Sequence, residues 1–125
     1  MSDVIKLSPL GKTWILDLDG TLVKHNGYKL DGHDALLPGV REFIDGIPAE
    51  DMIIIMTSRT KEQAEFTEAF LREEHIRYDL IIYCAPYGER ILINDKKTSG
   101  LKTAIAVNLE RNCFYGTRFE VDETL

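Results

Sequence analysis

Two short, unbroken apolar segments restrict the fold of this chain more than any other feature of its sequence. Residues 13–18 read TWILDL, and residues 52–57 read MIIIMT, in which five apolar residues in a row are followed by a hydroxyl. Short apolar runs bounded by polar residues are typical of β-strands, and an unbroken run indicates a strand buried on both faces. Such strands occur in parallel sheets that are covered by helices, so the sequence predicts an α/β fold.

The segments between and after these strands fit the same interpretation. Residues 38–47 are predicted to form a helix, with Pro38 in its first turn and Pro48 directly after its end. A second helix is predicted over residues 61–75, with Ser58 or Thr60 as its cap. Further strands are expected at residues 79–83, 91–93 and 104–109. We therefore expect a single domain over residues 1–125, a Rossmann-like three-layer sandwich with a central parallel sheet of about five strands.

Composition limits the compartment and the partners of the chain. Of its 125 residues, 44% are hydrophobic, and the net charge is −6 without a basic run, which argues against nucleic acid as a partner. Cys84 and Cys113 form no C-x-x-C pattern, so neither a zinc site nor a redox pair is indicated. No apolar run reaches membrane-spanning length, and the first residues lack the apolar core of a signal peptide. We expect a cytoplasmic protein without membrane contact.

The polar residues at the ends of the predicted strands carry the chemistry. Asp17 and Asp19 close the first strand, Thr57 closes the second, and Asp95 follows the strand predicted at 91–93. Ligands of parallel α/β sheets bind beyond the carboxyl ends of the strands, so we expect these residues at one edge of the sheet. Two acids that are two residues apart on a strand share a face and repel one another. A divalent cation relieves this repulsion, and oxygen ligands beside a phosphate favour Mg²⁺.

This set of residues fits phosphoryl transfer. A metal ion would hold a phosphate oxygen against one carboxylate, which attacks phosphorus and forms an aspartyl-phosphate. The second carboxylate would protonate the leaving oxygen and later activate water. A hydroxyl and a cation would bind the remaining phosphate oxygens. The sequence therefore predicts an enzyme, a Mg²⁺-dependent phosphomonoesterase.

Three motifs in this chain resemble those of a known family. DLDGTL, at residues 17–22, resembles the first motif of the haloacid dehalogenase (HAD) superfamily of phosphohydrolases. MIIIMTSR, at residues 52–59, resembles the second motif, and ILIND, at residues 91–95, resembles the fourth. The resemblance spans residues 13–110 and implies a HAD-like phosphatase domain with Mg²⁺ as its cofactor.

The resemblance implies a role for each matching residue. Asp17 would be the nucleophile and a metal ligand. Asp19 would be the general acid/base, with its backbone carbonyl facing the metal. Thr57 would donate to the transferring phosphoryl group, and Asp95 would be the third protein ligand of Mg²⁺, directly or through water.

The third motif departs from the family pattern. The family places a lysine, sometimes an arginine, after the third strand, and in small relatives it stands directly before a proline. Here the sequence YCAPYG has Ala85 at that place. We favour Lys97 or Lys96, just after Asp95, as the replacement, with Arg59 as a further candidate. Without a replacement, the loss of transition-state stabilisation would leave a poor catalyst.

Ordinary structural interpretations stand beside these roles. Thr57 would only cap the following helix, and Asp95 would only form a turn. The two lysines would be solvated surface residues. Arg59 would pair with Glu62 or Glu65 on its own helix.

The segment between the first two motifs bears on the substrate. Residues 24–37 are too short for a cap domain, so the protein is expected to be capless, with an open site. The side chains that would contact a substrate are Lys24, His25, Tyr28, Lys29 and His33 of this segment, with Ser58, Arg59 and Lys96 from the strand ends. A solvated loop with ordinary charges is an equal alternative.

The substrate class comes from a second, narrower resemblance. The DLDGTL…TSR core, together with ILINDKKTSGLKTAIAVNLERN at residues 91–112, resembles small phosphatases of bacterial surface-polysaccharide (capsule) biosynthesis. It implies a phosphorylated sugar or amino alcohol as the small-molecule substrate. Capless sites that act on small substrates are closed by a loop or by a partner subunit, so a homo-oligomer is one of two alternatives and the oligomeric state stays open.

Three other functions compete with this interpretation. A phosphatase acting on nucleic-acid ends is disfavoured by the negative charge. A module that binds phosphate but has lost turnover is favoured by Ala85 and disfavoured by Asp19, which a pure binder does not need. A nucleotide-binding Rossmann domain is excluded, because no glycine-rich loop follows a strand.

Overall fold

The computed structural model describes residues 3–115 and 117–125, which fall into two compact units. Each unit has its own parallel β-sheet. We call them the main unit, residues 11–86 and 109–115, and the terminal unit, of which residues 3–10, 87–108 and 117–125 are described.

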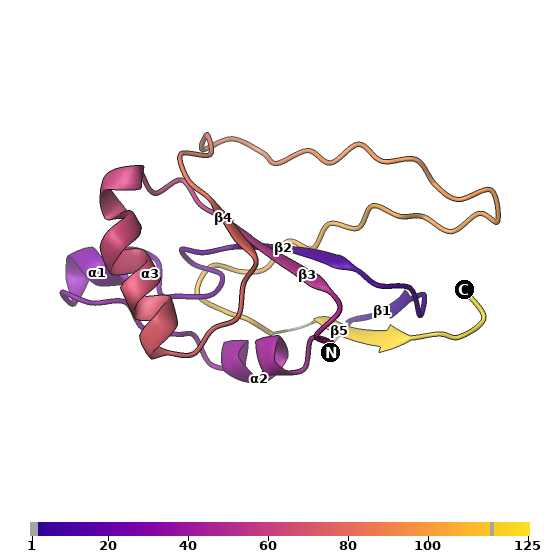
Figure 1. Ribbon diagram of the computed structural model, residues 1–125, viewed down its shortest axis with the longest axis horizontal. Helices are drawn as coiled ribbons and strands as arrows, with labels where there is room; N and C mark the ends of the chain where they lie inside the picture. Colours follow the sequence, from indigo (N-terminus) through magenta and orange to yellow (C-terminus); the bar gives the residue numbers. More distant parts are fainter. Residues whose placement is uncertain (1–2, 116) are drawn as a thin grey trace. The chain divides into compact units, whose positions relative to one another are not determined.

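The sheet of the main unit contains three parallel strands, in the order β2-β3-β4 (Figure 1). These are β2 (Thr13–Asp17), β3 (Met52–Met56) and β4 (Leu80–Ile82). They confirm the first three predicted strands to within one residue at each end. Asp17 is aligned with Met56, so β2 and β3 end at the same edge of the sheet.

One face of this sheet is more deeply buried than the other. Leu16, Ile53 and Ile55 are 8%, 0% and 0% exposed, whereas Ile15, which points to the opposite face, is 47% exposed. This alternation follows from the two-residue period of a strand. The unbroken apolar run of β2 therefore does not mean that both faces of this strand are buried.

Helices of the main unit match two of the predicted ones in shorter form. They are α2 (Val40–Asp45) and α3 (Ala64–Glu73), and α3 continues from a 3-10 turn, η1 (Lys61–Gln63). The short helix α1 (Gly27–Leu30) lies within the predicted loop. The Gln63 side chain accepts a hydrogen bond of 2.8 Å from the Thr60 N–H, which identifies Thr60 as the cap. None of the helices in residues 3–115 and 117–125 has the length and apolar character that a membrane crossing requires.

The core of the main unit joins its sheet to α2 and α3. Val40 and Ile44 of α2 and Leu71 of α3 are buried in it. Phe43 packs edge-on against both Trp14 and Phe114, with ring centroids 5.4 and 5.0 Å apart. Phe114 thereby attaches residues 109–115 to the rest of the unit.

A buried acid joins the starts of β2 and β3. Asp51, 4% exposed, accepts hydrogen bonds from the Lys12 N–H (3.1 Å) and from Trp14 Nε1 (3.0 Å). Burial is the largest influence and acts to raise the pKa of Asp51, but these hydrogen bonds and the nearby charges of Lys12 and Arg77 together hold that pKa below 3.8. The ionised carboxylate therefore stabilises the fold.

Replacing this acid should destabilise the protein in a pH-dependent way. A lowered pKa means that the stabilisation is present above pH 3.8 and is lost as the pH falls through the lower, folded-state pKa. We expect Asp51→Asn to lower the free energy of unfolding by about 1–2 kcal/mol at pH 7. The difference from wild type should shrink below pH 3.8, as measured by urea denaturation. Asp45→Asn, at an exposed position of α2, is the control. A difference that is the same at pH 7 and at low pH would contradict this account.

The terminal unit contains a two-stranded parallel sheet that the sequence does not predict. β1 (Asp3–Leu7) pairs with β5 (Thr117–Val121). Lys6 and Glu120 form a salt bridge of 2.6 Å across the pair. The strands are far apart in the sequence and neither is an unbroken apolar run, so no local signal connects them.

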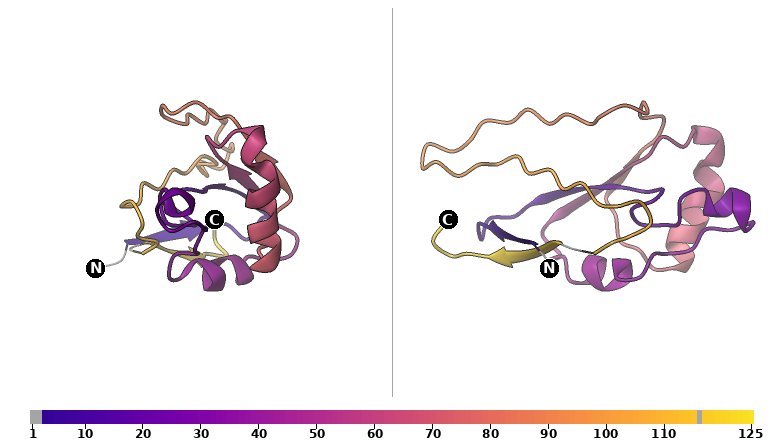
Figure 2. Two further views of the ribbon diagram at one scale, coloured as in Figure 1. Left: turned by 90° about the vertical axis from the view of Figure 1, so that its left-hand side faces the viewer. Right: turned by 180° about the vertical axis from the view of Figure 1, so that it is seen from behind.

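Residues 87–108 of the terminal unit correct two predictions. They form two extended arms without regular secondary structure (Figure 2). Hydrogen bonds from the Lys97 N–H to the Leu101 carbonyl and from the Gly100 N–H to the Lys97 carbonyl form the turn between the arms. The strands predicted at 91–93 and 104–109 are therefore wrong. Ile91 and Ile93 are 82% and 91% exposed, because no strand among the described residues pairs with them.

The structure thus confirms a small α/β architecture with parallel strands. The five strands among the described residues are divided between two sheets of three and two strands.

Candidate functional site

The two acids of the first motif lie on a turn that the core holds in place. Asp17 is the last residue of β2, and the chain then turns back within a few residues. Leu18 and Leu22, on either side of Asp19, are 1% and 0% exposed. The Leu18 carbonyl accepts hydrogen bonds from the N–H groups of Leu22 (2.9 Å) and Val23 (3.1 Å). The apolar residues of the motif therefore fix the backbone that carries the acids.

Glycine is required within this turn. Gly20 has a φ of 84°, in the left-handed region that other residues rarely adopt. Its N–H donates to the Val23 carbonyl at 2.7 Å. Thr21 then lies where its hydroxyl donates to Asp17 Oδ2 at 2.9 Å. This hydrogen bond fixes the rotation of the Asp17 carboxylate.

A polar hollow of about 290 Å³ lies at this turn. Both acids line it, and every lining residue belongs to the main unit. The lining residues are Asp17, Asp19, Gly20, Thr21, Leu109 and Arg111. Residues 17 and 19–21 of the first motif thus line one polar hollow, which makes it the candidate ligand site.

Arg59 is the centre of a buried polar network in the main unit. Its Nε and Nη2 donate to the two carboxylate oxygens of Asp19, at 3.0 and 2.8 Å. Its Nη1 and Nη2 donate to the two oxygens of Asp34, at 3.0 and 2.7 Å, and Nη1 also donates to the Thr67 hydroxyl. The side chains of Arg59 and Asp34 are each 2% exposed, and that of Asp19 is 23% exposed. Arg59 therefore links the first motif to residues 24–37 and to α3.

Aromatic rings and two negative charges stabilise the Arg59 cation. The guanidinium carbon lies 4.6 Å from the centre of the Tyr28 ring and 5.6 Å from that of Phe66. Burial acts to lower the pKa of Arg59, but the hydrogen bonds and charges of Asp19 and Asp34 outweigh burial and raise it above its ordinary value. Arg59 is a permanent internal cation.

This network changes the interpretation of Arg59. The expected pairing with Glu62 or Glu65 is wrong, because the partners are Asp19 and Asp34. The predicted contact of Arg59 with substrate would require breaking these hydrogen bonds.

Thr57 lies one residue beyond β3 and is 1% exposed. Its Oγ1 accepts a hydrogen bond of 3.0 Å from the Arg59 N–H, and this bond stabilises the turn that follows β3. Its carbonyl accepts a hydrogen bond of 3.0 Å from the N–H of Ala85, the residue at the place of the missing lysine. Neither Thr57 nor the half-buried Ser58 is among the residues that line the hollow.

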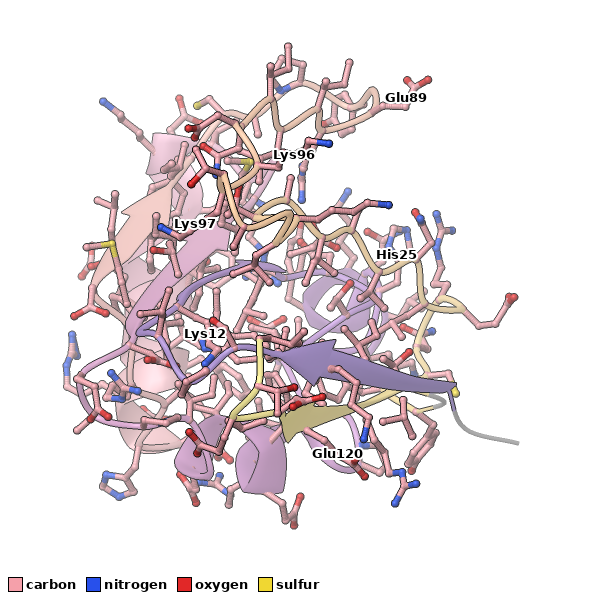
Figure 3. The ribbon with its side chains drawn as sticks, turned by 90° about the vertical axis from the view of Figure 1, so that its right-hand side faces the viewer. Lys12, His25, Glu89, Lys96, Lys97 and Glu120 are labelled. Carbon is pink, nitrogen blue, oxygen red and sulfur yellow. The ribbon has the colours of Figure 1, made fainter. Side chains whose placement is uncertain are left out.

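Asp95, Lys96 and Lys97 lie on the extended segment of the terminal unit. Figure 3 labels the two lysines. All three are exposed. The Asp95 carbonyl accepts a hydrogen bond from the Thr103 hydroxyl, which connects the two arms. Their predicted meeting with Asp17 stays a prediction.

The segment at residues 24–37 is more ordered than a solvated loop. Lys24 forms a salt bridge of 3.0 Å with Asp31. The N–H of His25 donates to the side-chain oxygen of Asn112 at 2.7 Å. A second hollow, of about 420 Å³, is lined by Tyr28, His33 and Asp34 of this segment together with residues of α3. It contains none of the residues of the first motif.

Three residues of this region have no role in the sequence interpretation. Asp34 is one of several polar residues in residues 24–37, and nothing in the sequence distinguishes it from its neighbours. Arg111 and Asn112 end the segment at residues 91–112, for which the second resemblance implies no chemistry. Their roles depend on contacts with residues far away in the sequence.

The hollow is compatible with Mg²⁺ but does not form a complete protein cage. Mg²⁺ is commonly held by one or two carboxylates, with water and phosphate oxygens as the other ligands. Asp17 supplies a carboxylate, whereas both carboxylate oxygens of Asp19 accept hydrogen bonds from Arg59, so Asp19 would contribute its backbone carbonyl. Within the described part of the chain, no group of three or more His, Cys, Asp or Glu side chains is arranged to hold a metal ion. A bound ion would therefore depend on water, backbone or phosphate oxygens as well.

Comparisons with known proteins find no relative: no family model matches the chain, and no curated protein or solved structure matches it significantly.

Proposed function

We propose that this protein is a Mg²⁺-dependent phosphomonoesterase of the HAD type, with a HAD-like, Rossmann-like domain that carries no cap. Its substrate would be a small phosphorylated metabolite, such as a sugar phosphate or an amino-alcohol phosphate of surface-polysaccharide synthesis. The observation that carries the proposal is the position of Asp17. Its carboxylate ends a parallel strand, is oriented by Thr21, and lines a polar hollow together with Asp19.

The residues of the hollow can perform a two-step hydrolysis. An oxygen of Asp17 attacks phosphorus while the bond from phosphorus to the ester oxygen breaks, and Asp19 gives that oxygen a proton. Water then attacks phosphorus, Asp19 takes its proton, and the bond to Asp17 breaks. The products are an alcohol and phosphate, and both acids return to their starting states.

Two residues tune these acids. The hydrogen bond from Thr21 keeps Asp17 in one orientation, as attack along a single line requires. Arg59 donates a hydrogen bond to each oxygen of Asp19 and so holds this carboxylate in one orientation. Bound Mg²⁺, held by Asp17 and by the Asp19 backbone carbonyl, with Asp95 as the proposed third ligand, would stabilise the negative charge on the phosphoryl oxygens.

The purified protein should release phosphate from an aryl phosphate in the presence of Mg²⁺. EDTA should abolish the release, and added Mg²⁺ should restore it. Beryllium fluoride, which mimics a phosphoryl group on a carboxylate, should inhibit it. Titration calorimetry should independently detect Mg²⁺ binding by the wild type. Activity that is unchanged by EDTA would contradict the metal requirement, and failure to hydrolyse any of a panel of sugar and amino-alcohol phosphates would contradict the enzyme.

A phosphate-binding module without turnover is the second candidate. It is favoured by Ala85, at the place of the family's lysine, and by the hydrogen bonds of both Asp19 oxygens to Arg59. Such a module would bind inorganic phosphate but release none from any ester. Binding and turnover measured on the same preparation separate the two candidates.

A further inference from the structure

The segment at residues 109–115 is fixed to the acidic turn by two hydrogen bonds. The Asn112 N–H donates to the Gly20 carbonyl at 2.8 Å, and the Asn112 side-chain oxygen accepts from the His25 N–H at 2.7 Å. Asn112 has a φ of 62°, a left-handed conformation that asparagine tolerates better than most residues. One residue therefore holds this segment to Gly20, next to Asp19, and to His25, just after the turn.

This attachment places Arg111 beside the turn. A Cβ atom added at Gly20 would lie only 3.2 Å from Arg111 Cγ. The glycine therefore allows the aliphatic part of the arginine to approach the backbone closely. Arg111 lines the same hollow as Asp17 and Asp19.

The charge of Arg111 is not used within the protein. Arg111 is exposed and, among the residues that the structure describes, forms no hydrogen bond or salt bridge. Arg59, the other arginine near these acids, is occupied by Asp19 and Asp34. The lining of the hollow thus contains two acids and one cation, Arg111, whose side chain forms no hydrogen bond or salt bridge with the described residues.

We propose that Arg111 binds the phosphoryl group of the substrate and supplies the cation that is missing at Ala85. The inference rests on the proposed function and names a residue that the motifs do not indicate. A guanidinium can donate two parallel hydrogen bonds to two phosphate oxygens, which positions the phosphorus as well as neutralising its charge. The expected ligand is a phosphate monoester dianion.

The test compares Arg111→Ala and Arg111→Lys with Arg72→Ala, a control at an exposed position of α3. Arg111→Ala should lower kcat/KM for an aryl phosphate by about 100-fold, the usual effect of losing one group that stabilises the transition state. Arg111→Lys should retain part of the activity, and Arg72→Ala should retain all of it. Added guanidinium should partly restore the activity of Arg111→Ala, which a merely structural role would not explain. Circular dichroism checks that each variant is folded.

The outcomes separate this inference from the proposed function. If wild type is active and folded Arg111→Ala is equally active, Arg111 is not the phosphate ligand and the phosphatase proposal stands. If wild type shows no turnover, the phosphatase proposal fails, and binding of inorganic phosphate decides the role of Arg111. Weaker phosphate binding by Arg111→Ala, with unchanged binding by Arg72→Ala, would support that role, and equal binding by all three proteins would overturn it.

Discussion

Asp17→Asn should abolish phosphate release, with a fall in kcat of roughly three orders of magnitude or more. The amide cannot attack phosphorus as the carboxylate does. It can still accept the hydrogen bond that the Thr21 hydroxyl donates to Asp17 in the wild type. The variant should therefore fold normally, and the loss should appear in kcat measured with saturating aryl phosphate and Mg²⁺.

Asp45→Asn makes the same chemical change at an exposed position of α2 and should leave kcat unchanged. Equal thermal unfolding of both variants and wild type would exclude a folding defect. Activity that persists in folded Asp17→Asn would remove Asp17 as the nucleophile.

Arg59→Leu should have the largest effect on stability of any substitution considered for the main unit. It removes every donor to Asp34 and leaves this buried carboxylate, with a side chain 2% exposed, without a countercharge. Breaking a buried ion pair by removing one partner typically costs about 3–5 kcal/mol. Chemical denaturation of wild type and variant measures the loss, and Arg72→Leu, at an exposed position, should cost less than about 1 kcal/mol.

Two further variants keep the prediction testable if Arg59→Leu does not fold. Arg59→Lys keeps the charge but cannot bridge two carboxylates through a planar fork, so it should lie between wild type and Arg59→Leu. The double substitution Arg59→Leu with Asp34→Leu removes both buried charges and should recover part of the stability. A denaturation midpoint of Arg59→Leu equal to that of wild type would show that the network contributes nothing.

The strands of the main unit were predictable because their signal is local. Each is a short apolar run, and the backbone of such a run forms the same strand wherever its partner lies. β2 and β3 follow this rule and bring Asp17 to the edge of the sheet. The acidic turn was predictable for the same reason, since its glycine and its flanking leucines are contiguous with the acids.

The same rule fails for residues 91–93. These apolar residues lack a pairing strand among the described residues, and without one they remain extended and exposed. β1 and β5, in contrast, are strands that the sequence does not predict. Their pairing joins the two ends of the described chain and depends on contacts that no local pattern encodes.

The ion-pair partners of Arg59 could not be predicted from its neighbours in the sequence. Glu62 and Glu65 are the acids nearest to Arg59 in a helical pattern, yet its partners are Asp34, 25 residues away, and Asp19, 40 residues away. In an isolated helix, Arg59 would pair with these nearby glutamates. Because Arg59 is buried, its charge is instead stabilised by the two carboxylates that surround it. The position of Arg111 beside the acidic turn cannot be predicted from the sequence for a related reason, because it depends on the hydrogen bonds of Asn112.

The attachment of Asn112 to the acidic turn has a consequence for how the protein is made. Synthesis on the ribosome proceeds from the N-terminus, so both acids and all three strands of the main unit emerge long before residues 109–115. A nascent chain that has already assembled its sheet still lacks Arg111. If Arg111 binds phosphate as proposed, this ability would arise only after the scaffold on which it depends has been synthesised.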